Sequence, residues 1–187
     1  MQQKGREGFT LIEVIVVAGI IAVIAGILVP IIFKEIDEAK KSRAMADIKS
    51  ISSAMLVFRK DLGIWPSKLP NCVSEATMLI SNSGELDDGK MHFSARGFDG
   101  TKALKLAALY INLGGCYTNW KGPYMASVTA DPWGNAYIIN SNAFAGTSGV
   151  WLLSAGPNGC VDTDAAGDLN GSPCTGSPGD DIGIRLQ

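Results

Sequence analysis

The chain has 187 residues, enough for one domain or for one domain with an attached segment. Hydrophobic residues make up 47% of it and charged residues 18%, which excludes a chain kept disordered by its charge. The net charge of −2 lacks the basic excess of a nucleic-acid-binding protein, so we expect no nucleic-acid partner. The chain has one histidine, so a catalytic triad would have to use His92, and most His-rich metal sites are excluded.

The first predicted element is a membrane-spanning helix. Residues 14–33 are twenty consecutive residues without a charged or hydrogen-bonding side chain. At about 1.5 Å per residue, such a helix matches the roughly 30 Å hydrocarbon core of a bilayer. The alternative is a buried core helix, which the rest of the chain is barely large enough to surround. We therefore predict a single pass through a membrane.

The flanks of this segment predict its orientation. Lys4 and Arg6 precede it, and basic residues on a short N-terminal flank favour a cytoplasmic N-terminus with the C-terminal part on the opposite side. A secretory signal peptide would have a shorter apolar region and a cleavage site of small residues, whereas Lys34 and Glu35 follow here. Any leader must then be removed on the cytoplasmic side.

The junction at residues 8–13 (GFTLIE) resembles the prepilin cleavage motif of type IV pilins and pseudopilins. The resemblance implies that a prepilin peptidase, which is also an N-methyltransferase, cuts after Gly8 and methylates Phe9. Residues 1–8 would be the cleaved leader, and residues 9–33 the transmembrane and polymerisation helix. Residues 34–187 would form a periplasmic domain that includes the second half of the long helix.

Glu13 places a carboxylate inside the predicted membrane segment. A carboxylate costs about 2.5–3.5 kcal/mol at the bilayer centre and less near an edge. One interpretation is a tolerated interfacial side chain. The other, implied by the resemblance to pilins, is an ion pair with the N-terminal amine of Phe9 in a neighbouring subunit of a filament.

Pro30 lies well inside the same predicted helix. It removes one backbone hydrogen bond and should kink or loosen the helix at residues 27–30. It is either an ordinary proline of a membrane helix or, as the resemblance implies, an assembly feature where the preceding segment loses helicity in the filament.

Residues 34–62 should continue the helix as an amphipathic half. Apolar side chains recur there at spacings of three and four residues and define one face: Ala44, Ile48, Ile51, Met55, Phe58 and Leu62. Gly63 and Pro66 then end the helix.

The remaining chain predicts a short second helix and three strands. The helix is expected over residues 102–113 and the strands over residues 136–140, 149–154 and 181–186. Three short antiparallel strands could cover the apolar face of the long helix. The predicted fold class is α+β: the type IV pilin fold, with a long N-terminal helix packed on a small antiparallel sheet and a calcium-type loop.

Four motifs are similar to those of the major pseudopilins of type II secretion systems: residues 121–124 (KGPY), 131–135 (DPWGN), 154–159 (SAGPNG) and 181–183 (DIG). The resemblance implies a structural subunit, not an enzyme, that polymerises through its hydrophobic helix into a pseudopilus and drives the export of folded proteins. The implied partners are further copies of the chain, minor pseudopilins, an inner-membrane assembly platform and the prepilin peptidase. The implied location is the bacterial inner membrane, with a periplasmic or surface filament after assembly.

Two departures from the pseudopilin pattern keep another function open. The extra cysteines and the longer loop between Gly159 and Asp180 leave room for a type IV pilus subunit in adhesion, motility or DNA uptake. A membrane-anchored hydrolase is the alternative from a different class. Its only conceivable nucleophilic group is His92, Ser94 and Asp99, and nothing in the sequence orients these residues.

An acidic loop predicts a calcium site. Residues 122–184 contain six aspartates and no lysine or arginine, and carboxylate oxygens suit Ca²⁺ better than zinc. The pseudopilin resemblance implies the backbone of Ala155, the side chain of Asn158, and both Asp180 and Asp181 as ligands. Where Asn158 stands the family usually has an aspartate, so Asp162, Asp164 and Asp168 are further candidates that could compensate. The alternative is a solvated acidic loop.

Four cysteines beyond the membrane segment allow three disulfide pairings. An oxidising compartment favours disulfides over thiols, and we favour Cys160–Cys174 and Cys72–Cys116. Closing a loop of about 15 residues contributes roughly 3 kcal/mol in the chain-entropy model, which would help to hold the acidic residues together. A four-cysteine metal site lacks the close spacing that it needs.

Overall fold

The computed structural model describes residues 8–146, 149–171, 174 and 179–186. Of the predicted leader, only Gly8 lies within these residues. The chain divides into two compact units, residues 1–39 and 40–187. The predicted functional boundaries after residues 8 and 33 remain predictions.

Helix α1 (Leu11–Leu62) contains 52 residues, and it is the one described helix that is long and apolar enough to cross a membrane. In the first unit its large apolar side chains are exposed. The helix continues through Pro30, so the loosening expected at residues 27–30 does not interrupt it. Gly63 ends it with a left-handed backbone (φ 72°) and donates its N–H to the carbonyl of Arg59 at 2.8 Å.

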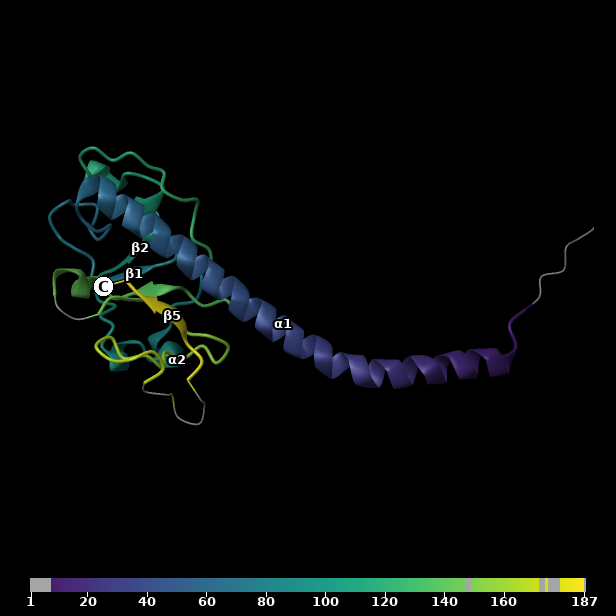
Figure 1. The fold of residues 1–187 in the computed structure, drawn as a ribbon. Coiled ribbons are helices and arrows are strands. Elements are labelled where there is room, and N and C mark those ends of the chain that lie inside the picture. Colours follow the sequence, from purple (N-terminus) through teal and green to yellow (C-terminus); the bar gives the residue numbers. More distant parts are fainter. Residues whose placement is uncertain (1–7, 147–148, 172–173, 175–178, 187) are drawn as a thin grey trace, which may run out of the picture. The chain divides into compact units, whose positions relative to one another are not determined.

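In the second unit, the predicted apolar face of α1 is confirmed. Ala44, Ile48, Ile51, Met55 and Phe58 are buried, and Leu62 is partly buried against the same core. This half of the helix crosses one face of the sheet (Figure 1).

The sheet has five strands in the order β2-β1-β3-β4-β5. The three predicted strands are present in shorter form as β3 (Ile138–Ile139), β4 (Trp151–Ser154) and β5 (Ile182–Arg185), and they pair antiparallel. Strand β1 (Met78–Ile80), which was not predicted, pairs antiparallel with β3 and parallel with β2 (Ala103–Lys105). The sheet is therefore mixed, and the prediction of a wholly antiparallel sheet was wrong at this edge.

The helix predicted over residues 102–113 is also absent. Residues 103–105 form β2, and two short 3-10 helices follow, η2 (Leu106–Leu109) and η3 (Leu113–Gly115). Pairing with β1 along three residues overrides the local helical preference of this segment. A positive φ of 62° at Gly114 prevents a regular helix further on.

Both faces of the sheet are buried at its central strands β1, β3 and β4. Successive strand residues alternate between two cores: Ile139 and Leu152 face α1, whereas Ile138 and Leu153 face the opposite layer. That opposite layer contains the short helix α2 (Asp88–Met91) and the 3-10 helix η1 (Ser94–Arg96) (Figure 1). This double burial explains why the strand sequences are almost continuously apolar.

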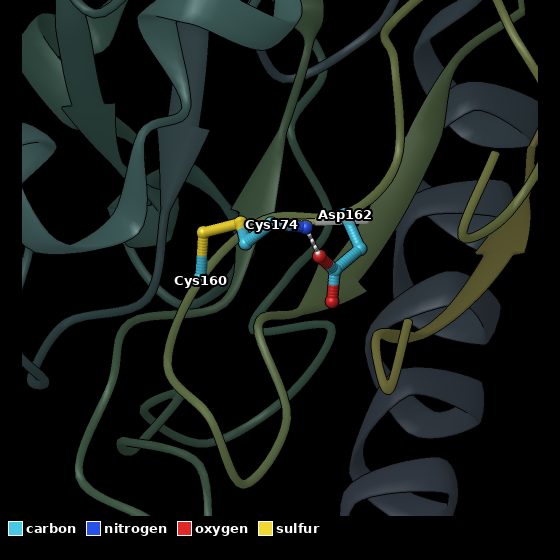
Figure 2. Close-up of side chains that lie close together, drawn as sticks. All are labelled: Cys160, Asp162 and Cys174. Atoms are coloured by element: carbon cyan, nitrogen blue, oxygen red, sulfur yellow. Dashed lines mark hydrogen bonds between the residues drawn. A yellow bond between two sulfur atoms is a disulfide. The ribbon is translucent and has the colours of Figure 1, made fainter. Parts of the chain in front are cut away.

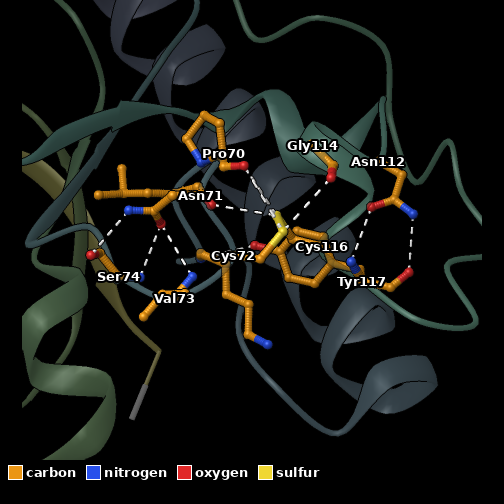
Figure 3. The surroundings of a disulfide bond; sticks show 11 residues. Pro70, Asn71, Cys72, Val73, Ser74, Asn112, Gly114, Cys116 and Tyr117 are labelled. Carbon is orange, nitrogen blue, oxygen red and sulfur yellow. Dashed lines mark hydrogen bonds between the residues drawn. A yellow bond between two sulfur atoms is a disulfide. The ribbon is translucent and has the colours of Figure 1, made fainter.

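A disulfide between Cys72 and Cys116 fastens the segment after α1 to the end of η3 (Figure 3). Asn71 supports the turn by accepting hydrogen bonds from the backbone N–H groups of Val73 and Ser74, at 3.2 and 3.0 Å. Cys72 is exposed, so this disulfide lies at the surface of the protein.

Candidate functional site

The residues at the predicted cleavage site are accessible. Gly8 is exposed, and the Phe9 side chain is 89% exposed. Beside Glu13, a shallow hollow is lined by the apolar side chains of Phe9, Val14, Val17, Ala18 and Ile21. An exposed apolar surface of this kind on a helix needs either lipid or another helix to cover it.

Glu13 and Thr10 form a capping box at the start of α1. The Glu13 carboxylate accepts hydrogen bonds from the backbone N–H of Thr10 at 2.8 Å and from its hydroxyl at 2.7 Å, and the backbone N–H of Glu13 reaches the Thr10 hydroxyl oxygen at 3.4 Å. The carboxylate therefore satisfies donors of its own helix. This capping role was not predicted from the sequence, although the spacing of Thr10 and Glu13 is the signal for it.

In the acidic loop, the structure places Asp162 at the centre. Its side chain is fully buried, and its two oxygens accept hydrogen bonds from three segments. Oδ2 accepts from the side-chain amide of Asn158 at 3.1 Å and from the backbone N–H of Asp180 at 3.2 Å, and Oδ1 accepts from the backbone N–H of Cys174. The backbone N–H of Asp162 in turn donates to Oδ2 of Asp181 at 2.8 Å.

Asp180 and Asp181 each leave one carboxylate oxygen unsatisfied. Within the described residues, Oδ1 of Asp180 and Oδ1 of Asp181 are buried and lack a hydrogen-bond partner. Burial raises the pKa of Asp180, and burial raises the pKa of Asp181 to about 7. Lys41 on α1 acts in the opposite direction on the pKa of Asp180.

These residues fit a calcium ion. All candidate donors are oxygens, and the described ion pairs within 4.0 Å do not include Asp162, Asp180 or Asp181. Gly156 brings the backbone beside Ala155 against Asp180. A Cβ on Gly156 would lie 2.3 Å from the carbonyl oxygen of Asp180 and 2.9 Å from its Oδ1.

The other predicted acidic candidates are used differently. Asp164 lies 3.9 Å from Arg96, and Asp168 is exposed. The buried carboxylate of Asp131 accepts hydrogen bonds from the backbone N–H groups of Trp133 and Asn135 and from the Ser154 hydroxyl. These bonds give Asp131 a structural role. The structure thus gathers Asn158, Asp162, Asp180 and Asp181 in one hydrogen-bonded cluster.

Cys160 and Cys174 are joined in a disulfide next to Asp162 (Figure 2). One ligand atom of each of these three residues lies within 4.8 Å of the others, but the two sulfur atoms are bonded to each other. They are therefore unavailable as thiolate ligands, and the group does not form a zinc site.

The three residues of the hydrolase alternative, His92, Ser94 and Asp99, do not form a catalytic group with one another. The hydroxyl of Ser94 donates to the carboxylate of Asp88, and Asp99 accepts from the backbone N–H of Thr101 at 2.9 Å. Ser94 and Asp99 line one hollow, whereas His92 lines another. The structure thus does not bring them together as nucleophile, base and orienting acid.

Two family models match the chain. The prokaryotic N-terminal methylation motif matches residues 3–29, and the type II secretion system protein G model matches residues 99–170. A core protein G from Pseudomonas aeruginosa is 29% identical over 167 residues, 88% of this chain and 95% of that protein. A second, from Escherichia coli K12, is 29% identical over 85% of this chain and 87% of its own length.

A toxin coregulated pilin from Vibrio cholerae is 33% identical over 66 residues, 35% of this chain and 30% of its own length. No solved structure matches the chain.

The long apolar helix, the methylation motif and the small mixed sheet together define a type IV pilin-like protein, anchored to a membrane by α1. Within that class the chain is similar to the major pseudopilins, represented by core protein G of type II secretion systems.

Proposed function

We propose that the chain is the structural subunit of a secretion pseudopilus, and that it polymerises through α1 to drive the export of folded proteins. The observation that carries this proposal is the match to core protein G over 95% of the Pseudomonas protein, which includes the helix and the globular part. The exposed apolar surface of α1 supplies the polymerisation surface. The role needs no chemistry from the chain itself.

The finer assignments follow from this role. The peptidase would cut after Gly8 and methylate Phe9, and the partners would be other copies, minor pseudopilins and the inner-membrane platform. The N-terminus would be cytoplasmic and residues 34–187 periplasmic. In the filament, Glu13 would exchange part of its capping bonds with Thr10 for the amine of a neighbouring Phe9, because an unpaired charge in a dry interface is costly.

Deleting the gene in its own organism tests the secretion role. We expect the loss of folded proteins from the culture medium, with restoration by the wild-type gene. Normal export together with the loss of surface pili, adhesion or DNA uptake would contradict the proposal and favour the pilus alternative. Mass spectrometry of the mature N-terminus, with and without the peptidase, tests the cleavage separately.

We further propose that the acidic cluster binds Ca²⁺. Asp180 and Asp181 would supply carboxylate oxygens, with the Ala155 carbonyl and the side chains of Asn158 and Asp162 completing or supporting the site. The support is the pair of buried, unsatisfied carboxylate oxygens, whose negative charge a divalent cation would neutralise. Calorimetric titration of the full chain in detergent with CaCl₂ tests this, and no heat of binding would contradict it.

A further inference from the structure

The strand-to-strand loop that carries the acidic cluster is closed by the Cys160–Cys174 disulfide, across 14 residues of sequence. Asp162 follows Cys160 by two residues, and its carboxylate accepts a hydrogen bond from the backbone N–H of Cys174 (Figure 2). The covalent bond and the carboxylate therefore hold the same two stretches of chain together.

The same carboxylate also determines where the proposed calcium ligands lie. Through its Oδ2, Asp162 holds the side chain of Asn158 at 3.1 Å and the backbone of Asp180 at 3.2 Å. Through its backbone N–H it holds Oδ2 of Asp181 at 2.8 Å. A displacement of Asp162 would consequently move three of the residues that we place around the ion.

Without the cation or the disulfide, repulsion between the clustered carboxylates disfavours this arrangement. Asp162 is hydrogen-bonded to both Asp180 and Asp181, so three acidic side chains lie close together, and their carboxylates repel one another when ionised. Neutral donors, namely backbone N–H groups and the side-chain amide of Asn158, would have to keep the three carboxylates close. A covalent closure of the loop reduces the conformational entropy that must be lost to gather them, so it pre-organises the site.

We propose that the Cys160–Cys174 disulfide is a positioning element of the calcium site, and that it sets the affinity for Ca²⁺ by holding Asp162 in place. This inference rests on the proposed calcium site. The disulfide forms when two thiols lose two electrons and two protons, which a disulfide-bonded oxidant of the thiol-oxidoreductase class accepts as it becomes a dithiol. High calcium affinity would then arise only after this oxidation.

A pair of matched variants tests the inference in the full chain in detergent micelles. Cys160→Ser/Cys174→Ser removes the bond beside Asp162, whereas Cys72→Ser/Cys116→Ser removes the other disulfide, whose neighbours are Pro70 and Gly114. Calorimetric titration with CaCl₂ should show a Kd raised at least tenfold in the first variant and less than twofold in the second. An equal change in both variants, or no change in the first, would overturn the inference.

The wild-type protein provides a second measurement if the first variant fails to fold. Coupling between two equilibria is reciprocal, so a bond that strengthens calcium binding tenfold must itself be favoured tenfold by calcium. In a dithiothreitol redox buffer, saturating CaCl₂ should raise the oxidised-to-reduced ratio of Cys160–Cys174 about tenfold and leave that of Cys72–Cys116 unchanged, as read by alkylation and mass spectrometry.

The two proposals fail in different ways. Calcium binding by the wild type with no effect of calcium on the redox ratio of Cys160–Cys174 would overturn the inference and leave the calcium site intact. The absence of calcium binding by the oxidised wild type would overturn both.

Discussion

The phenol of Tyr137 donates a hydrogen bond to the carboxylate of Asp47 at 3.0 Å, across 90 residues of sequence. Tyr137 immediately precedes β3 and is only 1% exposed, whereas Asp47 lies on α1 and also faces Arg43 at 3.7 Å. Burial raises the pKa of Tyr137, and the bond to Asp47 raises it further. The phenol therefore remains a donor throughout the physiological pH range and connects α1 to the sheet.

Tyr137→Phe should lower the free energy of unfolding of the globular part by about 1–2 kcal/mol, because a hydrogen bond to a charged group is lost while the partly exposed Asp47 regains water. Urea unfolding of the full chain in detergent, followed by tryptophan fluorescence, measures this. Tyr124→Phe is the control, since the Tyr124 hydroxyl accepts a 3.2 Å hydrogen bond from the neutral backbone N–H of Lys121 instead of donating to a charged group. Equal losses in both variants would contradict the assigned role.

The parts of the fold that the sequence predicted correctly have local signals. The apolar face of α1 follows from residue spacing, and Gly63 marks its end. Strands β3, β4 and β5 follow from short β-prone runs between turns. By contrast, β2 exists only because β1 lies beside it, and the sequence of residues 102–113 taken alone favours a helix. Such pairing between distant segments has no local signal.

For the candidate site, too, the sequence pointed to some of the clustered residues, but the structure was needed to tell neighbouring candidates apart. Resemblance identified Asn158, Asp180 and Asp181, and local spacing placed Asp162 in a group with Asp164 and Asp168. The structure separates that group, because Asp162 points into the buried cluster while Asp164 approaches Arg96. Side-chain direction in an irregular loop depends on the chain that closes over it, so spacing alone could not rank the three aspartates.

Glu13→Leu should leave membrane insertion intact but reduce filament yield at least tenfold, because the proposed partner of the Phe9 amine is removed. Carbonate extraction measures insertion, and shearing followed by immunoblotting measures filaments. Since Glu13 also caps its own helix through Thr10, two controls separate the roles. Glu13→Gln keeps an acceptor without charge and should assemble poorly, whereas Thr10→Ala removes one capping partner and should assemble. The reverse result would assign Glu13 to capping alone.

Calcium removal should destabilise the globular part. A ligand present at 100 times its Kd stabilises the folded state by about 2.7 kcal/mol, which corresponds to roughly 5–10 °C in Tm for a domain of about 150 residues. Near-ultraviolet circular dichroism of the full chain, with CaCl₂ and then with excess EGTA, measures the shift. MgCl₂ is the control, since Mg²⁺ demands a stricter octahedral geometry. Superimposable melting curves would refute the calcium site.

Gly156→Ala tests whether the close approach of Gly156 to Asp180 is required. Gly156 has φ 64°, and a Cβ there would lie 2.3 Å from the Asp180 carbonyl oxygen. Gly115→Ala is a matched control, because its φ is 68° and nothing lies within 4 Å of the added Cβ. Both variants incur the left-handed penalty of about 1–2 kcal/mol, and only Gly156→Ala must also displace the backbone of Asp180.

We therefore expect Gly156→Ala to lose about 2 kcal/mol more than Gly115→Ala in urea unfolding, in line with other substitutions that force backbone to move in a packed site. It should also lose the calcium-dependent rise in Tm, because Asp180 would be shifted, whereas Gly115→Ala should retain that rise. If both variants kept the full calcium response, the backbone contact between Gly156 and Asp180 would be irrelevant to the ion, and the ligands would have to lie elsewhere in the loop.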